Sequence, residues 1–308
     1  MKLEFKNDYI SAQPDPFVCK IPNGWAMYTT GKDGVHAYYC EMPIGKWEYR
    51  GVVCNMEGYH EYWAPCMYYE DGWFYLYFSC MPIGADVSEE HLCVARSRSA
   101  FGPFENIRCL YDYFSIDAHV VRTDAGLFLW YAMDRMDCDR VGTRVVVDRL
   151  LDPETPEGNP VEKVVPSFDE EIFMKDRYQQ GQHWHTIEGP FWLEVDGWQY
   201  VMYSGACFEN ETYHIGFATA KSQEQDLTKV VFEKHTANGS FEPLMTKNEV
   251  EEGVGHHSVI CYDGQYYAVY HARDYVPDAR LTGDQRTARI CKLHFASGLI
   301  TFHEMKMC

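Results

Sequence analysis

Three acidic residues, Asp15, Asp117 and Glu188, each lie nine residues before a glycine that ends a short polar turn. They are far apart in the chain, but the shared spacing indicates one structural position in a repeated unit. Carboxylates that meet from separate repeats repel one another, raise one another's pKa and cost stability. Such an arrangement is typical of acid–base chemistry, so these three residues are the candidate catalytic groups.

Glycoside hydrolysis is the reaction that best fits two aspartates and one glutamate in one place. It needs one carboxyl that protonates the leaving oxygen and one ionised carboxylate that activates water or attacks the sugar. A third acid nearby can keep the first one protonated. Glu188 lies in the run HWHTIEGPFW, whose apolar setting favours the protonated form and whose aromatic faces can stack on a sugar ring.

The elements that would bring the acids together are five copies of one hairpin. Each copy has a short strand, a turn that ends in glycine, and an aromatic-rich strand. Asn-Gly and Asp-Gly turns before alternating aromatic residues are strong hairpin signals. A spacing of ~50–70 residues between copies suits one four-stranded propeller blade per repeat. The copies begin at Asp15, Trp63, Asp117, Glu188 and Gly255.

Further strands follow most of the hairpins, and we predict them over residues 91–97, 143–151, 213–222 and 286–295. The segment 153–160, rich in Pro and Gly, has the pattern of a loop inside the third repeat. The sequence therefore predicts an all-β fold, a single five-bladed β-propeller over residues 1–308, with catalytic residues at the starts of inner strands around the channel. A β-sandwich is the alternative, but its turns should recur every ~8–12 residues without the longer period.

Composition excludes several classes of partner. The net charge of −19 disfavours nucleic acid, anionic membranes and polyacidic substrates, and is compatible with a neutral ligand or a bound cation. The N-terminus has no apolar signal-peptide segment, so we predict a cytoplasmic protein. Its twelve cysteines never form a C-x-x-C motif, which argues against a zinc site of common spacing and predicts reduced core thiols.

Six short motifs, taken together in their order and register, resemble the family 43 glycoside hydrolases. That family consists of five-bladed propellers that act on arabinose- and xylose-containing glycans. The resemblance covers nearly the whole chain, from about residue 12 to the C-terminus. The motifs are PDPF (14–17), WAP (63–65), IDAHVV (116–121), IEGPF (187–191), GVGHHSV (253–259) and YHAR (270–273).

The resemblance assigns a role to each candidate. It makes Asp15 the general base, Glu188 the general acid, and Asp117 the residue that orients the acid and tunes its pKa. Trp63 would form a wall of the sugar pocket, although a buried core tryptophan explains it equally well. Arg286 resembles an arginine that binds substrate hydroxyls, and Arg273 and Arg289 compete for that role.

His256 matches the position of a channel histidine that in many family members lies near a metal ion. We expect that no cofactor is required, and leave open whether a cation such as Ca²⁺ is bound there, since an acidic channel suits a hard cation. The alternative is a histidine that only forms hydrogen bonds. His183 and His185 lack a third ligand in the sequence and are expected at the pocket rim or in packing, and His271 is expected as a strand residue.

The leading hypothesis is an inverting, exo-acting glycosidase that releases a terminal pentose, most of all α-L-arabinofuranose, from short oligosaccharides. A β-xylosidase and an endo-acting arabinanase are the alternatives within the family. A propeller that binds carbohydrate without turnover is the alternative of another class. The segments 80–91 and 207–214 are expected to wall the substrate pocket, and the oligomeric state is left open.

Overall fold

The computed structural model describes residues 1–6, 12–276 and 285–305. Nearly every regular element in this part of the chain is a β-strand, and the two helices, η1 (Val87–Glu89) and η2 (Asp169–Glu171), are single 3₁₀ turns. Neither is long or apolar enough to cross a membrane. The prediction of an all-β chain without long helices is confirmed for these residues.

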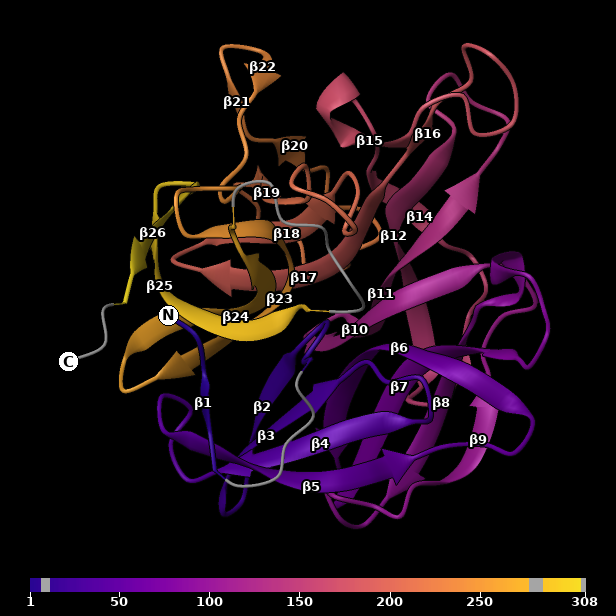
Figure 1. Ribbon diagram of the computed structural model, residues 1–308, viewed down its shortest axis with the longest axis vertical. Helices are drawn as coiled ribbons and strands as arrows, with labels where there is room; N and C mark the ends of the chain where they lie inside the picture. Colours follow the sequence, from indigo (N-terminus) through magenta and orange to yellow (C-terminus); the bar gives the residue numbers. More distant parts are fainter. Residues whose placement is uncertain (7–11, 277–284, 306–308) are drawn as a thin grey trace.

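Five larger sheets follow one another along the chain (Figure 1). The first has the order β1-β5-β4-β3-β2 and consists of β1 (Glu4–Phe5), β2 (Phe17–Ile21), β3 (Gly24–Thr29), β4 (Val35–Cys40) and β5 (Lys46–Cys54). The second consists of β6 (Tyr59–Glu70), β7 (Trp73–Pro82), β8 (His91–Ser97) and β9 (Glu105–Cys109).

The third sheet is the largest and follows the order β10-β11-β12-β16-β15, with β13 and β14 also paired to β12. Its strands are β10 (Ser115–Thr123), β11 (Gly126–Arg135), β12 (Gly142–Asp152), β13 (Thr155–Pro156), β14 (Val161–Val164), β15 (Ile172–Met174) and β16 (Trp184–His185). The predicted loop over 153–160 is therefore interrupted by the two residues of β13.

The fourth and fifth sheets have four strands each. The fourth consists of β17 (Ile187–Val195), β18 (Trp198–Gly205), β19 (His214–Ala220) and β20 (Glu233–Lys234). The fifth consists of β23 (Glu251–Tyr262), β24 (Gln265–Asp274), β25 (Thr287–Ala296) and β26 (Leu299–Glu304). A small hairpin, β21 (Thr236–Ala237) with β22 (Ser240–Phe241), lies between them in the chain. The five predicted hairpins and the four further strands are confirmed within a few residues.

The sheets form a closed ring. The first strands, β2, β6, β10, β17 and β23, contact one another in that order, and β23 contacts β2 again. Buried apolar clusters fill the spaces between consecutive sheets, and one of them, with Trp25 and Trp47 of the first sheet and Ile290 of the fifth, closes the ring. This is a single-domain β-propeller, and the predicted fold is confirmed to that extent.

The N-terminal residues tie the two ends of the ring together. The backbone N–H of Leu3 donates to the carbonyl of Ala288 in β25 at 2.9 Å. One residue later the chain enters β1, which pairs in parallel with β5 of the first sheet. The first and last sheets are thus joined by backbone hydrogen bonds as well as by apolar packing. Figure 1 shows the two sheets as neighbours in the ring.

Candidate active site

Four of the innermost strands, β6, β10, β17 and β23, have a bulge at the same level, and a residue with left-handed backbone lies there. In the first sheet the equivalent residue comes just before β2. A left-handed conformation is uncommon outside glycine, and a bulge re-aims the side chains beside it. When residues are counted back from the strand pair that closes each hairpin turn, the five positions are equivalent. They are Asp15 (φ 52°), Ala64 (φ 44°), Asp117 (φ 65°), Gly189 (φ 58°) and His256 (φ 37°).

The predicted register is therefore wrong by one residue for Glu188, and likewise for Trp63 and Gly255, the first residues of two other copies. In β10–β11 the turn closes at Gly126, which already pairs with Thr123. In β17–β18 the turn contains Gly197, and the closing pair is Val195 with Trp198. Counting back from the glycine thus starts at different points in the two hairpins. Glu188 lies one residue before the left-handed position that Asp15 and Asp117 occupy.

Asp15 is held by donors on several sides. Thr30 Oγ1 donates to its Oδ2 at 2.5 Å, and Arg286 Nη1 lies 3.2 Å from its Oδ1. Its backbone N–H donates to Nδ1 of His271, which is fully buried. Burial opposes the charge, but Arg286 and the neighbouring histidines outweigh it and hold the pKa of the Asp15 carboxyl well below its usual range. Asp15 is therefore an ionised acceptor at neutral pH.

Asp117 and Glu188 are close enough to influence each other. The backbone N–H of Gly189 donates to Asp117 Oδ2 at 2.9 Å, which fixes one carboxylate beside the strand that carries the other. Burial, with the charges of Glu188 and Asp15, raises the pKa of Asp117 well above its usual value. Burial also raises the pKa of Glu188, to about 7, against the hydrogen bond from Tyr213. The pair therefore retains a proton near neutral pH.

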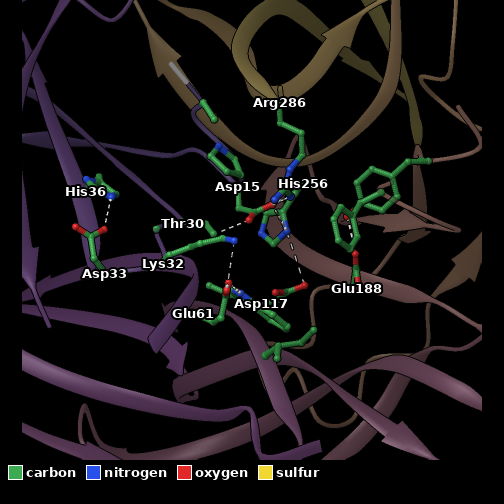
Figure 2. Close-up of a pocket in the computed structure, with 17 residues that line it drawn as sticks. Asp15, Thr30, Lys32, Asp33, His36, Glu61, Asp117, Glu188, His256 and Arg286 are labelled. Atoms are coloured by element: carbon green, nitrogen blue, oxygen red, sulfur yellow. Dashed lines mark hydrogen bonds and ion pairs between the residues drawn. The ribbon is translucent and has the colours of Figure 1, made fainter. Parts of the chain in front are cut away.

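His256 lies between the two aspartates. Its Nδ1 is 3.5 Å from Asp15 Oδ1 and 3.8 Å from Asp117 Oδ2, and Figure 2 shows the ring between the two carboxylates. Its backbone N–H donates to Ser204 Oγ at 2.7 Å, which fixes the left-handed residue to the fourth sheet. Burial lowers the pKa of His256, so the ring is neutral at neutral pH.

These residues line one cavity of about 590 Å³, a size common for small-ligand sites. All six residues proposed from the sequence lie on its wall, together with Phe208 and Tyr213 of the predicted wall segment 207–214 and further residues that the sequence did not indicate. The lining residues are Ala12, Pro14, Asp15, Thr30, Gly31, Lys32, Asp33, His36, Glu61, Trp63, Ile116, Asp117, Glu188, Phe208, Tyr213, His256 and Arg286.

The remaining candidates lie elsewhere. Arg273 donates to the carbonyl of Phe208 at 2.6 Å, and Arg289 pairs with Glu251 at 2.9 Å, so both support loops and strands. His183 and His185 line a different, polar cavity, where Arg140 Nη1 lies 2.9 Å from His185 Nε2. The predicted pocket wall over 207–214 is present, but no residue of 80–91 lines the catalytic cavity.

The site contains both a proton acceptor and a proton donor. An ionised carboxylate, Asp15, can accept a proton from water, while the Asp117–Glu188 pair can donate one to a leaving group. The cavity offers Trp63 and Phe208 as apolar walls. The guanidinium of Arg286, 4.8 Å from the Phe208 ring centre, can donate hydrogen bonds to hydroxyl oxygens of a ligand. These are the groups that an acid–base glycosidase needs.

Comparison with known proteins agrees with that chemistry. The sequence profile of the glycosyl hydrolases family 43 matches residues 7–300. The chain belongs to this family. It is therefore a glycoside hydrolase, and family 43 enzymes cleave the glycosidic bond with inversion of configuration.

Two relatives cover most of this family 43 chain. It is 26% identical over 284 residues, 84% of this chain and 78% of the relative, to an extracellular exo-α-(1→5)-L-arabinofuranosidase, ArbA, of Cellvibrio japonicus. A thermostable family-43 glycoside hydrolase of known crystal structure is 26% identical, with a TM-score of 0.78, and the match covers 96% of this chain and 93% of that one.

The fold is shared with a more distant enzyme. An α-L-arabinofuranosidase from Lactobacillus brevis superposes with a TM-score of 0.76 at 18% identity, over 94% of each chain. At this identity the similarity establishes the common propeller fold and leaves the substrate to be argued from the site.

The described residues contain no group of three or more His, Cys, Asp or Glu side chains placed to hold a metal ion. His256 and the two aspartates are engaged with one another, with Arg286 and with backbone donors. A hard cation beside His256 would therefore take most of its ligands from water.

Proposed function

We propose that this family 43 enzyme is an exo-acting hydrolase that removes a terminal pentose, α-L-arabinofuranose in the first place, from short oligosaccharides. The observation that carries the proposal is that two carboxyls on one cavity wall have different surroundings, Asp15 beside Arg286 and Thr30, and Glu188 buried beside Tyr213. The pKa of Asp15 is held low by Arg286 and its histidine neighbours, and that of Glu188 is raised by burial to about 7.

In the proposed reaction, Asp15 removes a proton from a water molecule, and the water oxygen forms a bond to the anomeric carbon. At the same time Glu188 gives its proton to the glycosidic oxygen, and the bond from that oxygen to the sugar breaks. Asp117 keeps the proton on Glu188 and orients its carboxyl. Attack from the face opposite the leaving group inverts the configuration.

The surrounding residues fit recognition of one sugar. Trp63 and Phe208 offer apolar faces to the ring, and Arg286 and His256 offer polar contacts to its hydroxyls. On one side the rim is closed where Gly31, beyond β3, pairs with Tyr62 of β6 through hydrogen bonds of 3.1 and 2.8 Å. Closure on this side supports exo action, whereas an endo-acting enzyme needs a groove open at both ends.

The arabinofuranoside preference is supported by the exo-arabinofuranosidase among the relatives.

The five larger sheets and the apolar clusters between them support a five-bladed propeller. The cytoplasmic location stays a prediction, and that relative is extracellular. A cation at His256 also stays a prediction, which metal analysis of the purified protein would check.

Turnover of aryl glycosides tests the proposal. We expect release from the aryl α-L-arabinofuranoside, weaker release from the β-xyloside, and none from long arabinan. Proton NMR in the first minutes, before mutarotation, should show the anomer opposite to the bond cleaved. Activity on xyloside alone would assign a xylosidase, cleavage of long arabinan alone an endo-arabinanase, and sugar binding without turnover would overturn the enzymatic function.

A further inference from the structure

Three thiols meet in the second sheet, away from the catalytic cavity. Cys93 Sγ lies 2.7 Å from Cys109 Sγ and 3.9 Å from Cys80 Sγ. All three are free thiols in this structure. Seven of the described cysteines are buried, as predicted for core thiols, but Cys109 and Cys261 are exposed. The sequence prediction of core thiols is wrong for these two, and one of them touches a buried partner.

The strand pairing places Cys93 and Cys109 opposite each other. Cys93 in β8 is the register partner of Cys109 in β9. The adjacent pair of opposite residues, Leu92 and Leu110, is hydrogen bonded, because the N–H of Leu110 donates to the carbonyl of Leu92 at 2.7 Å. Cys93 and Cys109 therefore occupy a non-hydrogen-bonded position, where Cα atoms are about 4.5 Å apart and side chains are closest. That separation lies within the range of disulfide bonds, about 4.4–6.8 Å.

From this register, contact and exposure we propose that Cys93 and Cys109 are a thiol–disulfide site that closes into a cross-strand disulfide with a small disulfide oxidant. The inference does not depend on the proposed function. The bond would fasten β9, the last strand of the second sheet, to β8.

The two thiols are suited to different steps. Cys109 is exposed and accessible to an oxidant, whereas Cys93 is fully buried. The hydrogen bond between them lowers the pKa of the Cys109 thiol below its usual value and raises that of Cys93. Since the thiolate is the nucleophile in thiol–disulfide exchange, Cys109 is the residue that reacts first.

The exchange balances with a disulfide such as oxidised glutathione. The Cys109 thiolate attacks one glutathione sulfur, forms a mixed disulfide and releases a glutathione thiolate. Cys93 then attacks Cys109 Sγ, and its proton leaves with the second glutathione as a thiol. Two electrons pass from the protein to the oxidant, and one protein disulfide replaces one glutathione disulfide.

The test equilibrates the full-length protein in oxidised and reduced glutathione and maps the peptides without reduction. We expect loss of two of the twelve thiols, one peptide pair linking Cys93 to Cys109, and a Tm higher by about 5 °C that returns on reduction. Cys109→Ser and Cys93→Ala should abolish the link and the Tm shift. Cys261→Ser, which removes another exposed thiol, should behave as the wild type.

Three results would overturn the proposal, and the map of the wild-type protein is enough to show each of them. The first is retention of all twelve thiols in the folded, oxidised sample. The second is a Cys80–Cys93 link in place of the expected one. The third is a stable glutathione adduct on Cys109 that Cys93 does not displace.

Discussion

The hydroxyl of Tyr213 donates to Glu188 Oε1 at 2.6 Å, and the same tyrosine ring stacks on His271, with ring centres 5.7 Å apart and planes 8° from parallel. His271 in turn accepts the backbone N–H of Asp15. The ring fits because position 255 is glycine: a Cβ there would lie 1.8 Å from a Tyr213 ring carbon. One tyrosine thus touches both the proposed acid and the residue that supports the proposed base.

Replacing this tyrosine by phenylalanine should move the alkaline limit of activity upward. The hydroxyl stabilises the ionised form of Glu188 and so opposes the rise of its pKa from 4.5 to about 7 caused by burial. Tyr213→Phe removes that bond, worth about 1.5–3 kcal/mol to a charged acceptor, and should raise the pKa by about 1–2 units. Because the acid works when protonated, the alkaline limb of kcat/KM should shift to higher pH.

The control for this change is Tyr69→Phe, at an exposed tyrosine of β6. It should leave the pH–rate profile unchanged. An alkaline limb that stays in place in Tyr213→Phe, or moves to lower pH, would remove Tyr213 from the tuning of Glu188.

Asp15→Asn removes the group proposed to deprotonate water while keeping its shape and its hydrogen bond from Thr30. Activity should fall by ~10²–10⁴-fold or more on good and poor leaving groups alike, because every substrate needs an activated water. In the wild type, the lowered pKa of Asp15 should place the acidic limb of kcat/KM below the ordinary carboxyl range. Near-normal turnover by the folded variant would exclude Asp15 as the base.

The sequence could predict the hairpins and the three acids because both depend on local chemistry. Turn glycines and alternating aromatics define a strand pair within about twenty residues. The register of Glu188 was wrong because turns of the same length place their glycine differently. Gly126 opens β11 with φ 140°, whereas Gly197 lies inside its turn with φ 75°.

Tyr213 and Thr30 could not be assigned from the sequence for another reason. Tyr213 is followed by β19, and Thr30 comes just after β3, so neither shares a motif with an acid. Their contacts with Glu188 and Asp15 arise only when the strands assemble into their sheets and the sheets close into a ring. The one available signal was the expectation that segment 207–214 walls the pocket.

Glu188→Gln should separate substrates by their leaving groups. Natural glycosides leave as poorly acidic alcohols and need a proton, so their hydrolysis should fall most. Aryl glycosides with acidic phenols need less assistance and should lose less activity. Initial rates on an arabino-oligosaccharide and on a nitrophenyl arabinofuranoside give the comparison, and equal losses on both would show that Glu188 is not the proton donor.

Asp117→Asn should shift the alkaline limb in the direction opposite to Tyr213→Phe. The two carboxyls repel each other when both are ionised, and that repulsion favours a proton on the pair. Without the second charge, Glu188 should ionise at lower pH, and some activity should remain. The pH dependence of kcat/KM measures the shift, and an unmoved limb would contradict the tuning role of Asp117.

Glu188→Gln should also raise the stability of the protein relative to the wild type, but only at pH values above the ordinary carboxyl pKa of 4.5. Burial raises the pKa of Glu188 from 4.5 to about 7, so the wild type gains stability from this group at acidic pH and loses it as the pH rises through that interval. Glutamine does not ionise, so the stability of the variant relative to the wild type should grow between these pH values by about 3 kcal/mol and then level off. Urea unfolding at several pH values measures the difference. Glu194→Gln, at an exposed glutamate of the same strand, is the control, and its stability difference from the wild type should not change over this pH range.

An unchanging difference for Glu188→Gln as well would mean that Glu188 is already ionised at ordinary carboxyl pH. The proposed acid would then lack its proton at neutral pH.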